Sequence, residues 1–207
     1  MVDDGTGSTW SHLDGSALAG EMAGEQLAIR ALQTTTWGAW LEEHPQTTTV
    51  GIDTGYNYRN VTTLGREGLR GGFIATLDGI DTRLSEGALV IGVIAGDGAV
   101  AFPIDAAPTS APMQDSVGGV PVVVLEDSNG DPALAYHRLL TDGRVLDFER
   151  RDGAIYDLQT GSRWASSGLA VEGELTGVQL AFVTSFFTEW YGWAAFHPDT
   201  TIYGDAT

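Results

Sequence analysis

Residues 190–200 read WYGWAAFHPDT, and residues 37–47 read WGAWLEEHPQT. Each stretch places two tryptophans three positions apart and follows them with a His-Pro pair. Aromatic residues at this spacing share one face of a helix, and proline stops a helix. Both stretches therefore predict an aromatic helix that ends at its histidine, and we expect these helices to anchor on a sheet and close two related units.

Polar residues stand where the two helices are expected to begin. Thr34 to Thr36 offer N-cap hydroxyls to the first helix, and Ser185 offers one to the second. In the second helix Phe186 would join the tryptophans on the apolar face. We expect Gly192 to weaken this helix, so that burial of its aromatic face must stabilise it.

The tryptophan-rich stretches belong to a longer internal repeat. Gly7-Ser8-Thr9-Trp10 is matched by Gly161-Ser162-Arg163-Trp164, and all six tryptophans pair at a separation of about 153 residues. The pairs are Trp10 with Trp164, Trp37 with Trp190, and Trp40 with Trp193. A period of this length indicates duplicated domains and not a solenoid.

Short β-branched runs separated by turn dipeptides fill the second half of the chain. Asp97-Gly98, Asn129-Gly130, Asp142-Gly143 and Asp152-Gly153 are typical hairpin turns. The strands expected between them are residues 89–95, 99–104, 120–126, 133–139, 145–149, 162–165 and 178–183. We therefore predict an α+β, mostly β fold: an antiparallel meander with aromatic helices, internally duplicated as one complete and one partial copy.

The two copies are unequal. We expect residues 1–50 to form a partial first copy of turn, strand and aromatic helix, residues 51–88 a connector, and residues 89–207 the complete second copy. The first copy has no sheet of its own ahead of its Gly-Ser-x-Trp element. The face of Trp10, Trp37 and Trp40 is thus a predicted surface for protein or self-association.

Composition bounds the class of protein. The chain has 207 residues, 28 acidic and 10 basic, with a net charge of −18. Every basic residue is arginine, a pattern that predicts a halophile-like protein whose acidic surface is screened by salt. Such a charge excludes nucleic acid as a partner, because phosphate neutralisation needs clustered cations.

The chain contains no cysteine, which excludes disulfides and thiolate chemistry. No apolar run reaches the length of a membrane span, and the acidic N-terminus is unlike a signal peptide. We expect a soluble protein that is cytoplasmic as written, with export open if the biological start lies upstream of Met1.

Candidate ligand-binding residues are few. His44 and His197 occupy equivalent positions and can titrate or bind metal, although a histidine ending a helix more often caps carbonyls. Asp53, Tyr56 and Arg59 form the most polar irregular segment and are the first choice for a surface site, with a plain turn as the alternative.

Other chemistry finds no support in the residue patterns. Ser8 and Ser162 follow glycine outside any Gly-x-Ser-x-Gly motif, so a serine hydrolase is excluded and a turn role is favoured. The acidic segment 126–131 lacks the spacing of an EF-hand and is better explained as a hairpin turn than as a calcium loop. We predict no catalytic residue, no metal site and no cofactor.

With these motifs placed, the chain resembles the family known as domain of unknown function 3179. The matching elements follow the family's order: Gly7 to Ser11, Thr35 to Trp40, His44-Pro45, Asp53 to Tyr56, Ile91 to Val93, Gly118 to Val122, Thr160 to Trp164, and Phe196 to Thr200. The resemblance implies the fold and a duplicated architecture.

Family members typically contain a segment with two cysteines ahead of the first Gly-Ser-x-Trp element, and this chain departs from that pattern. In the second copy Asp127 and Gly130 stand where such cysteines would be. Two hypotheses follow. The first is a non-catalytic binding or scaffold domain; the alternative is a metal-binding or redox-related enzyme fragment whose cysteine-bearing segment is missing.

Overall fold

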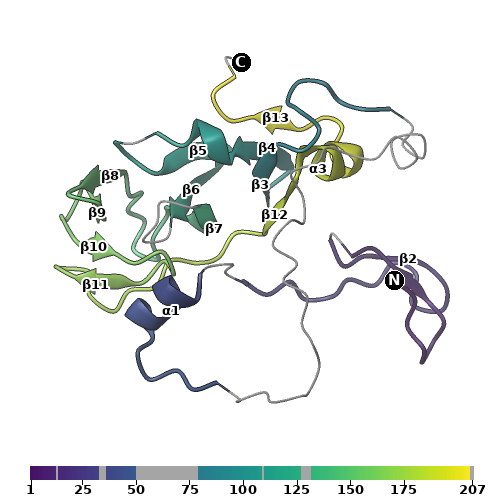
Figure 1. The fold of residues 1–207 in the computed structure, drawn as a ribbon, viewed down its shortest axis with the longest axis horizontal. Coiled ribbons are helices and arrows are strands. Elements are labelled where there is room, and N and C mark those ends of the chain that lie inside the picture. The colour runs from purple at the N-terminus through teal and green to yellow at the C-terminus, as the bar shows by residue number, and fades with distance from the viewer. Residues whose placement is uncertain (13, 33–35, 50–78, 109, 127–131, 206–207) are drawn as a thin grey trace, which may run out of the picture. The chain divides into compact units, whose positions relative to one another are not determined.

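The computed structural model describes residues 1–12, 14–32, 36–49, 79–108, 110–126 and 132–205, and most of its regular structure is short antiparallel strands (Figure 1). The predicted mostly β fold is confirmed. The chain divides into two compact units, Met1–Leu32 and Gln33–Thr207. The domain boundaries expected near residues 50 and 88 stay a prediction.

The N-terminal unit, Met1–Leu32, is a small ribbon. Strand β1 (Thr9–Trp10) pairs antiparallel with β2 (Ala17–Ala19), and an isolated bridge joins Val2 to Thr9. Strand β1 is the short strand that the sequence predicts through Trp10.

The larger unit contains helix α1 (Trp37–Glu43), helix α3 (Trp190–Phe196), a 3-10 turn η1 (Ile104–Ala106) and three further sheets. The sheet orders are β12-β3-β4-β13, β5-β6-β7 and β11-β10-β9-β8. The strands are β3 (Leu89–Ala95), β4 (Gly98–Pro103), β5 (Met113–Val117), β6 (Val120–Glu126), β7 (Pro132–His137), β8 (Phe148–Arg151), β9 (Ala154–Asp157), β10 (Arg163–Trp164), β11 (Ala170–Glu172), β12 (Ser185–Glu189) and β13 (Thr201–Ile202).

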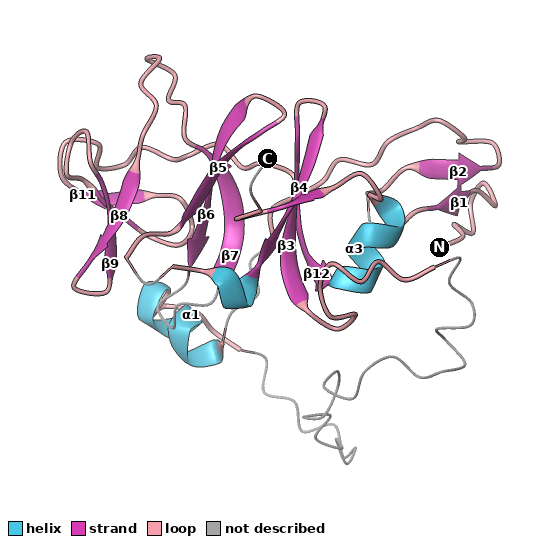
Figure 2. Ribbon diagram, turned by 90° about the horizontal axis from the view of Figure 1, so that it is seen from above, coloured by secondary structure: helices cyan, strands magenta, loops and turns pink. Residues whose placement is uncertain are grey.

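Strand β6 lies at the centre of the core because both of its faces are covered. Val122 and Val124 belong to the cluster shared with β3, β4 and β5, whereas Val123 and Leu125 belong to the cluster shared with β8 to β11. Successive side chains of a strand point to opposite faces, so this division follows directly from the pleat. Figure 2 shows the resulting succession of three sheets.

Helix α3 covers the outer face of the β3–β4 sheet. Trp190 and Trp193 are fully buried there against Val90 and Ala101. The anchoring role predicted for the second aromatic helix is confirmed in this unit. Arg83 also contacts this helix and the turn after it. Its guanidinium lies 5.2 Å from the Trp190 ring centroid and donates to the carbonyl of Thr200 at 2.7 Å.

The structure corrects four details of the sequence prediction. Ser185 does not cap a helix: residues 185–189 form strand β12, and helix α3 begins at Trp190. Pairing of β12 with β3 satisfies the backbone groups that a longer helix would have used. Strand β13 runs parallel to β4, so the sheet is not a simple meander.

The other two corrections concern strand limits. Residues 178–183 form only isolated bridges at Gln179 and Phe182, because their backbone bonds go to different partners, including the carbonyls of Gly168 and Ala135. The strand expected to begin at Val145 begins at Phe148 instead.

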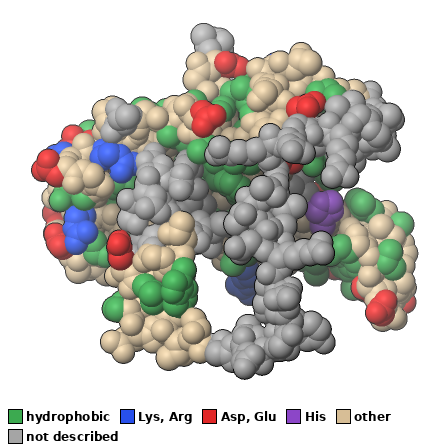
Figure 3. Space-filling view, in the orientation of Figure 1, with side chains coloured by type: hydrophobic (Ala, Val, Ile, Leu, Met, Phe, Trp, Pro, Cys, Tyr) green, Lys and Arg blue, Asp and Glu red, His purple; other side chains and the backbone are tan. Residues whose placement is uncertain are grey.

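Charges of both signs are interspersed over the β8–β11 sheet (Figure 3). Ion pairs there join Arg144 to Asp142 and Glu174, and Arg163 to Glu172. Such exposed pairs contribute little to stability individually. Neither helix in the described part of the chain is long and apolar enough to cross a bilayer.

Candidate functional site

Two loops with the pattern Asp-x-x-Thr-Gly-Ser-x-Trp share one set of hydrogen bonds. They are residues 3–10, the first loop, and residues 157–164, the second loop. Each lies in a different compact unit. Their hydrogen bonds are the same, but the side chains around them are buried to different degrees.

The second loop is organised by a fully buried carboxylate. Asp157 accepts hydrogen bonds from the backbone N–H of Thr160 at 2.6 Å and from the indole of Trp164 at 3.0 Å. The Ser162 hydroxyl, also buried, accepts the backbone N–H of Leu175 at 3.0 Å. These contacts account for the serine and tryptophan of the motif as structural groups.

The first loop repeats these contacts. Asp3 accepts the backbone N–H of Thr6 at 2.6 Å and the indole N–H of Trp10 at 2.8 Å. The buried Ser8 hydroxyl accepts the backbone N–H of Met22 at 3.0 Å. Hydrogen bonds from Thr6, and then from Trp10, hold the pKa of the Asp3 carboxyl well below its usual range.

A glycine lies in close contact with each of these serines. Gly20 has φ of +98°, and a Cβ added there would lie 2.7 Å from the Cα of Ser8. Gly173 has φ of +95° and the same 2.7 Å approach to Ser162. Only glycine combines this backbone conformation with such a close contact, so the two loops share steric requirements as well as hydrogen bonds.

The surroundings of the second loop form a closed core. Ile155, Trp164, Leu175 and Leu180 all belong to one buried cluster. Phe148 of strand β8 completes it, with its ring 5.8 Å from that of Trp164 in an edge-to-face arrangement at 79°. This aromatic pair is therefore sealed from water by the neighbouring strand.

Backbone contacts identify the corresponding side chains around the first loop. Met1 and Trp10 exchange two hydrogen bonds of 2.7 Å, in the place of the Ile155–Trp164 pair of the second loop. The N–H of Leu27 bonds to the carbonyl of Gly15, as that of Leu180 bonds to Gly168. Met1, Trp10, Met22 and Leu27 thus correspond to the four core residues.

These four side chains do not form a core. They line an open cavity of about 440 Å³ together with Val2, Asp3 and Thr6, which we call the N-terminal hollow. Leu27 is 48% exposed and Met1 is 66% exposed, whereas Leu180 is 2% exposed and Ile155 is 4% exposed. The hollow thus corresponds to the buried core beside the second loop, but no strand among the described residues of the N-terminal unit pairs where β8 does.

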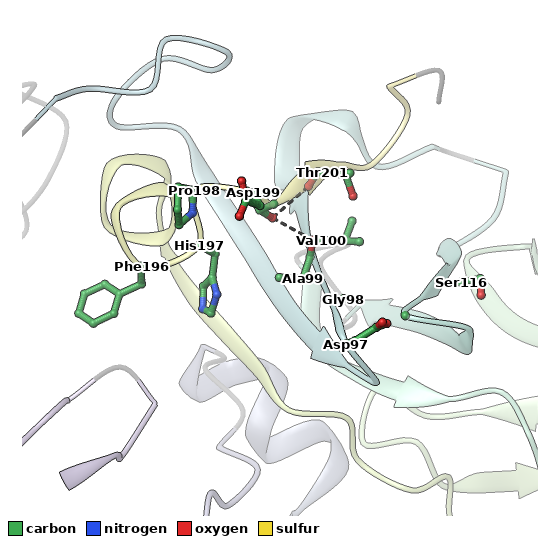
Figure 4. A pocket seen from close by; sticks show the side chains of 12 residues that line it. Asp97, Gly98, Ala99, Val100, Ser116, Phe196, His197, Pro198, Asp199 and Thr201 are labelled. Atoms are coloured by element: carbon green, nitrogen blue, oxygen red, sulfur yellow. Dashed lines mark hydrogen bonds between the residues drawn. The ribbon is translucent and has the colours of Figure 1, made fainter. Parts of the chain in front are cut away.

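A second cavity, of about 500 Å³, lies at the end of helix α3 beside His197. Its polar lining residues include Asp97, Ser116 and Asp199. Figure 4 shows these side chains spread around the cavity and not converging on one point. Among the described residues, no group of three His, Cys, Asp or Glu side chains is placed to hold a metal ion.

The His-Pro turn that borders this cavity has clear structural contacts. The His197 ring lies 4.1 Å from that of Trp193, and the Trp193 indole donates to the buried Thr200 hydroxyl at 2.9 Å. That hydroxyl in turn lies 3.1 Å from the carbonyl of Ala99 on strand β4. The turn therefore ties helix α3 to the sheet.

Helix α1 has the same turn in a more open setting. The His44 ring lies 4.1 Å from that of Trp40 and is tilted by 39°, and the Trp40 indole donates to Thr47 at 2.8 Å. Trp37 is 53% exposed, although the corresponding Trp190 is fully buried. Of the predicted apolar face, Trp10 belongs to the N-terminal unit and Trp37 and Trp40 to the larger unit, so its use in association stays a prediction.

The structure describes only some of the predicted site residues. Asp53, Tyr56 and Arg59 lie outside the described residues, as do Asp127 and Gly130. His197 borders a cavity and His44 is exposed on its own helix, with no ligand role tested for either. Met1, Met22 and Leu27 are not among the predicted site residues, although each lies 153 or 154 residues before its counterpart, Ile155, Leu175 or Leu180, as the repeat requires.

The comparison with protein families shows to which family the chain belongs. The model described as "Protein of unknown function (DUF3179)" matches residues 1–200. The chain belongs to the DUF3179 family. The match covers both loops and both His-Pro turns, and so confirms the resemblance found in the sequence. No curated protein and no solved structure matches this DUF3179 chain.

Proposed function

We propose that this DUF3179 protein is a non-catalytic binding module and that the N-terminal hollow is its binding face. One observation carries the proposal: four side chains that are exposed or partly exposed around the first loop correspond to four that are buried around the second. We interpret the two loops and their aromatic helices as products of an internal duplication. Under this interpretation the second copy is the covered counterpart of the proposed binding face.

Energetics support occupation of the hollow. Fully burying a side chain such as leucine or methionine stabilises a complex by about 1.5–3 kcal/mol relative to exposure. Leu27 is half exposed, and Trp10 and Met22 are partly exposed. A partner that fills the hollow can gain this free energy without rearranging the loop, since the hydrogen bonds of Asp3 and Ser8 already hold it.

The test is binding of a neutral apolar dye, Nile red, to the full chain. A neutral dye is appropriate because the N-terminal unit is acidic. We expect saturable binding that is lost in Leu27→Asn and kept in Leu18→Asn, since Leu18 is also exposed but does not line the hollow. An absence of binding, or equal loss in both variants, would overturn the proposal.

The alternative hypothesis, a metal-binding or redox-related enzyme, has a separate test. Metal analysis of protein purified without a chelating tag, followed by thermal melts with and without EDTA, addresses His44 and His197 directly. Bound metal whose removal lowers the melting temperature would favour the alternative over the binding module.

A further inference from the structure

The second loop carries a strand on the edge that the first loop leaves open. Strand β9 pairs with β10 on one side and with β8 on the other. In the β8 pairing, Phe148 lies opposite Asp157 and Glu149 lies opposite Tyr156. The N–H of Leu158 extends this edge by bonding to the carbonyl of Asp147 at 2.8 Å.

The first loop presents the same edge. Met1 directs its N–H and C=O groups to Trp10, with both bonds 2.7 Å long. Successive residues of an antiparallel strand direct their backbone groups to opposite sides. Val2, the counterpart of Tyr156, therefore directs its N–H and C=O away from Trp10, toward the side where β8 lies in the second copy.

The adjoining hollow has room for an aromatic side chain. In the second copy Phe148 packs its ring against Trp164 and is 3% exposed. The corresponding Trp10 already lines the open cavity. An aromatic residue opposite Asp3 would meet Trp10 as Phe148 meets Trp164.

Charge also constrains the partner. Residues 1–32 carry five acidic side chains and a single arginine. Strand β8, which covers the equivalent edge, reads Phe148-Glu149-Arg150-Arg151 and ends in two arginines. A basic segment would be drawn to the acidic unit and a strongly acidic one repelled.

We infer that the N-terminal hollow takes up an extended segment of a partner protein, which adds as a strand to the Val2 edge, inserts an aromatic side chain against Trp10, and carries basic residues after it. This inference rests on the proposed binding role of the hollow. Backbone pairing supplies affinity, and the aromatic pocket supplies specificity.

The probe is a synthetic peptide with the sequence of residues 145–151, added to the full chain. Binding is followed by NMR of backbone amides. We expect saturable shifts at Val2 and Asp4 with slowed hydrogen exchange of the Val2 amide. A control peptide with Phe148→Ser should bind at least about tenfold more weakly.

Two variants of the protein separate strand addition from simple filling of the hollow. Val2→Pro removes the backbone N–H donor at the edge and should bind the peptide about tenfold more weakly than Val2→Ala. Val2→Ala loses the valine side chain but keeps the N–H, so it is the matched control for the lost donor. Equal affinity of the Val2→Pro and Val2→Ala variants would overturn the inference.

The remaining outcomes distinguish failure of the strand inference from failure of the proposed binding role. Nile red binding without peptide binding would sink the strand inference and leave the binding role of the hollow intact, whereas failure of both ligands would sink both proposals. Concentration-dependent dimerisation that excess peptide reverses would assign the edge to a second copy of the chain and contradict a foreign partner.

Discussion

Asp3 and Asp157 make the same hydrogen bonds in different surroundings. Asp157 is fully buried and accepts the indole of Trp164, whereas Asp3 accepts that of Trp10 at the rim of an open cavity. The chemistry of the loop is therefore local, since it persists whether or not a core forms beside it. Charge-assisted bonds of this kind hold a turn in place before any partner arrives.

A pH titration tests this local organisation. The pKa of Asp3 is lowered from 3.8, with Thr6 as the largest cause. A carboxyl with a depressed folded pKa adds stability above its unfolded pKa, and this stability is lost as pH falls through the folded value. The first loop should thus keep its structure below pH 3.8 and lose it only in stronger acid.

The measurement is NMR titration of the Asp3 carboxyl together with the Trp10 indole N–H. Thr6→Ala removes the hydroxyl hydrogen bond that lowers the pKa of Asp3 most, so this pKa should return toward its usual range. A carboxyl that titrates at 3.8 in the unmodified protein would show that the loop is not preorganised.

At the scale of elements, packing decides where helix α3 begins and which face it buries. Trp190 and Trp193 lie against β3, whereas residues 185–189 pair with that same strand as β12. The periodicity that places Phe186 on a helix face is real, but strand pairing overrides it. The fit of helix α3 to the sheet depends on Gly92, because a Cβ added there would lie 2.1 Å from Cε3 of Trp193.

Gly92→Ala should therefore destabilise the protein by about 1–3 kcal/mol, because the Trp193 ring cannot shift within a close-packed core without strain. The matched control is Gly87→Ala, where nothing lies within 4 Å of the added Cβ. Chemical denaturation followed by tryptophan fluorescence measures both. Equal stability of the two variants would contradict the packing of α3 described above.

At the scale of the whole molecule, a net charge of −18 outweighs the ion pairs on the surface. Pairs such as Arg151 with Glu149 at 2.8 Å are exposed and screened by salt. Self-repulsion of the acidic surface should consequently weaken the folded state in dilute buffer. This is the physical content of the proposal that the protein is adapted to high salt.

Salt titration tests that proposal. Below a few hundred millimolar salt we expect tryptophan fluorescence to shift to the red as buried indoles such as Trp190 meet water. Added salt should reverse the shift. A spectrum unchanged between dilute buffer and about 3 M KCl would refute the salt requirement.

The amino-acid sequence by itself determined the local features of this protein. Turn dipeptides such as Asp97-Gly98 and β-branched runs such as 89–95 and 120–126 located the hairpins and strands of the core. The paired motifs also predicted matching loops and His-Pro turns, because these depend on contacts within a few residues of one another.

Only the tertiary structure decided which of the matching elements are covered. Leu180 is buried and Leu27 is half exposed, although they follow the tryptophan of the same motif by 16 and 17 residues. Their difference arises from Phe148 and the neighbouring strands, which contact one loop through pairings made across the chain. Burial is a property of what lies beside a segment, and a local pattern contains no record of it.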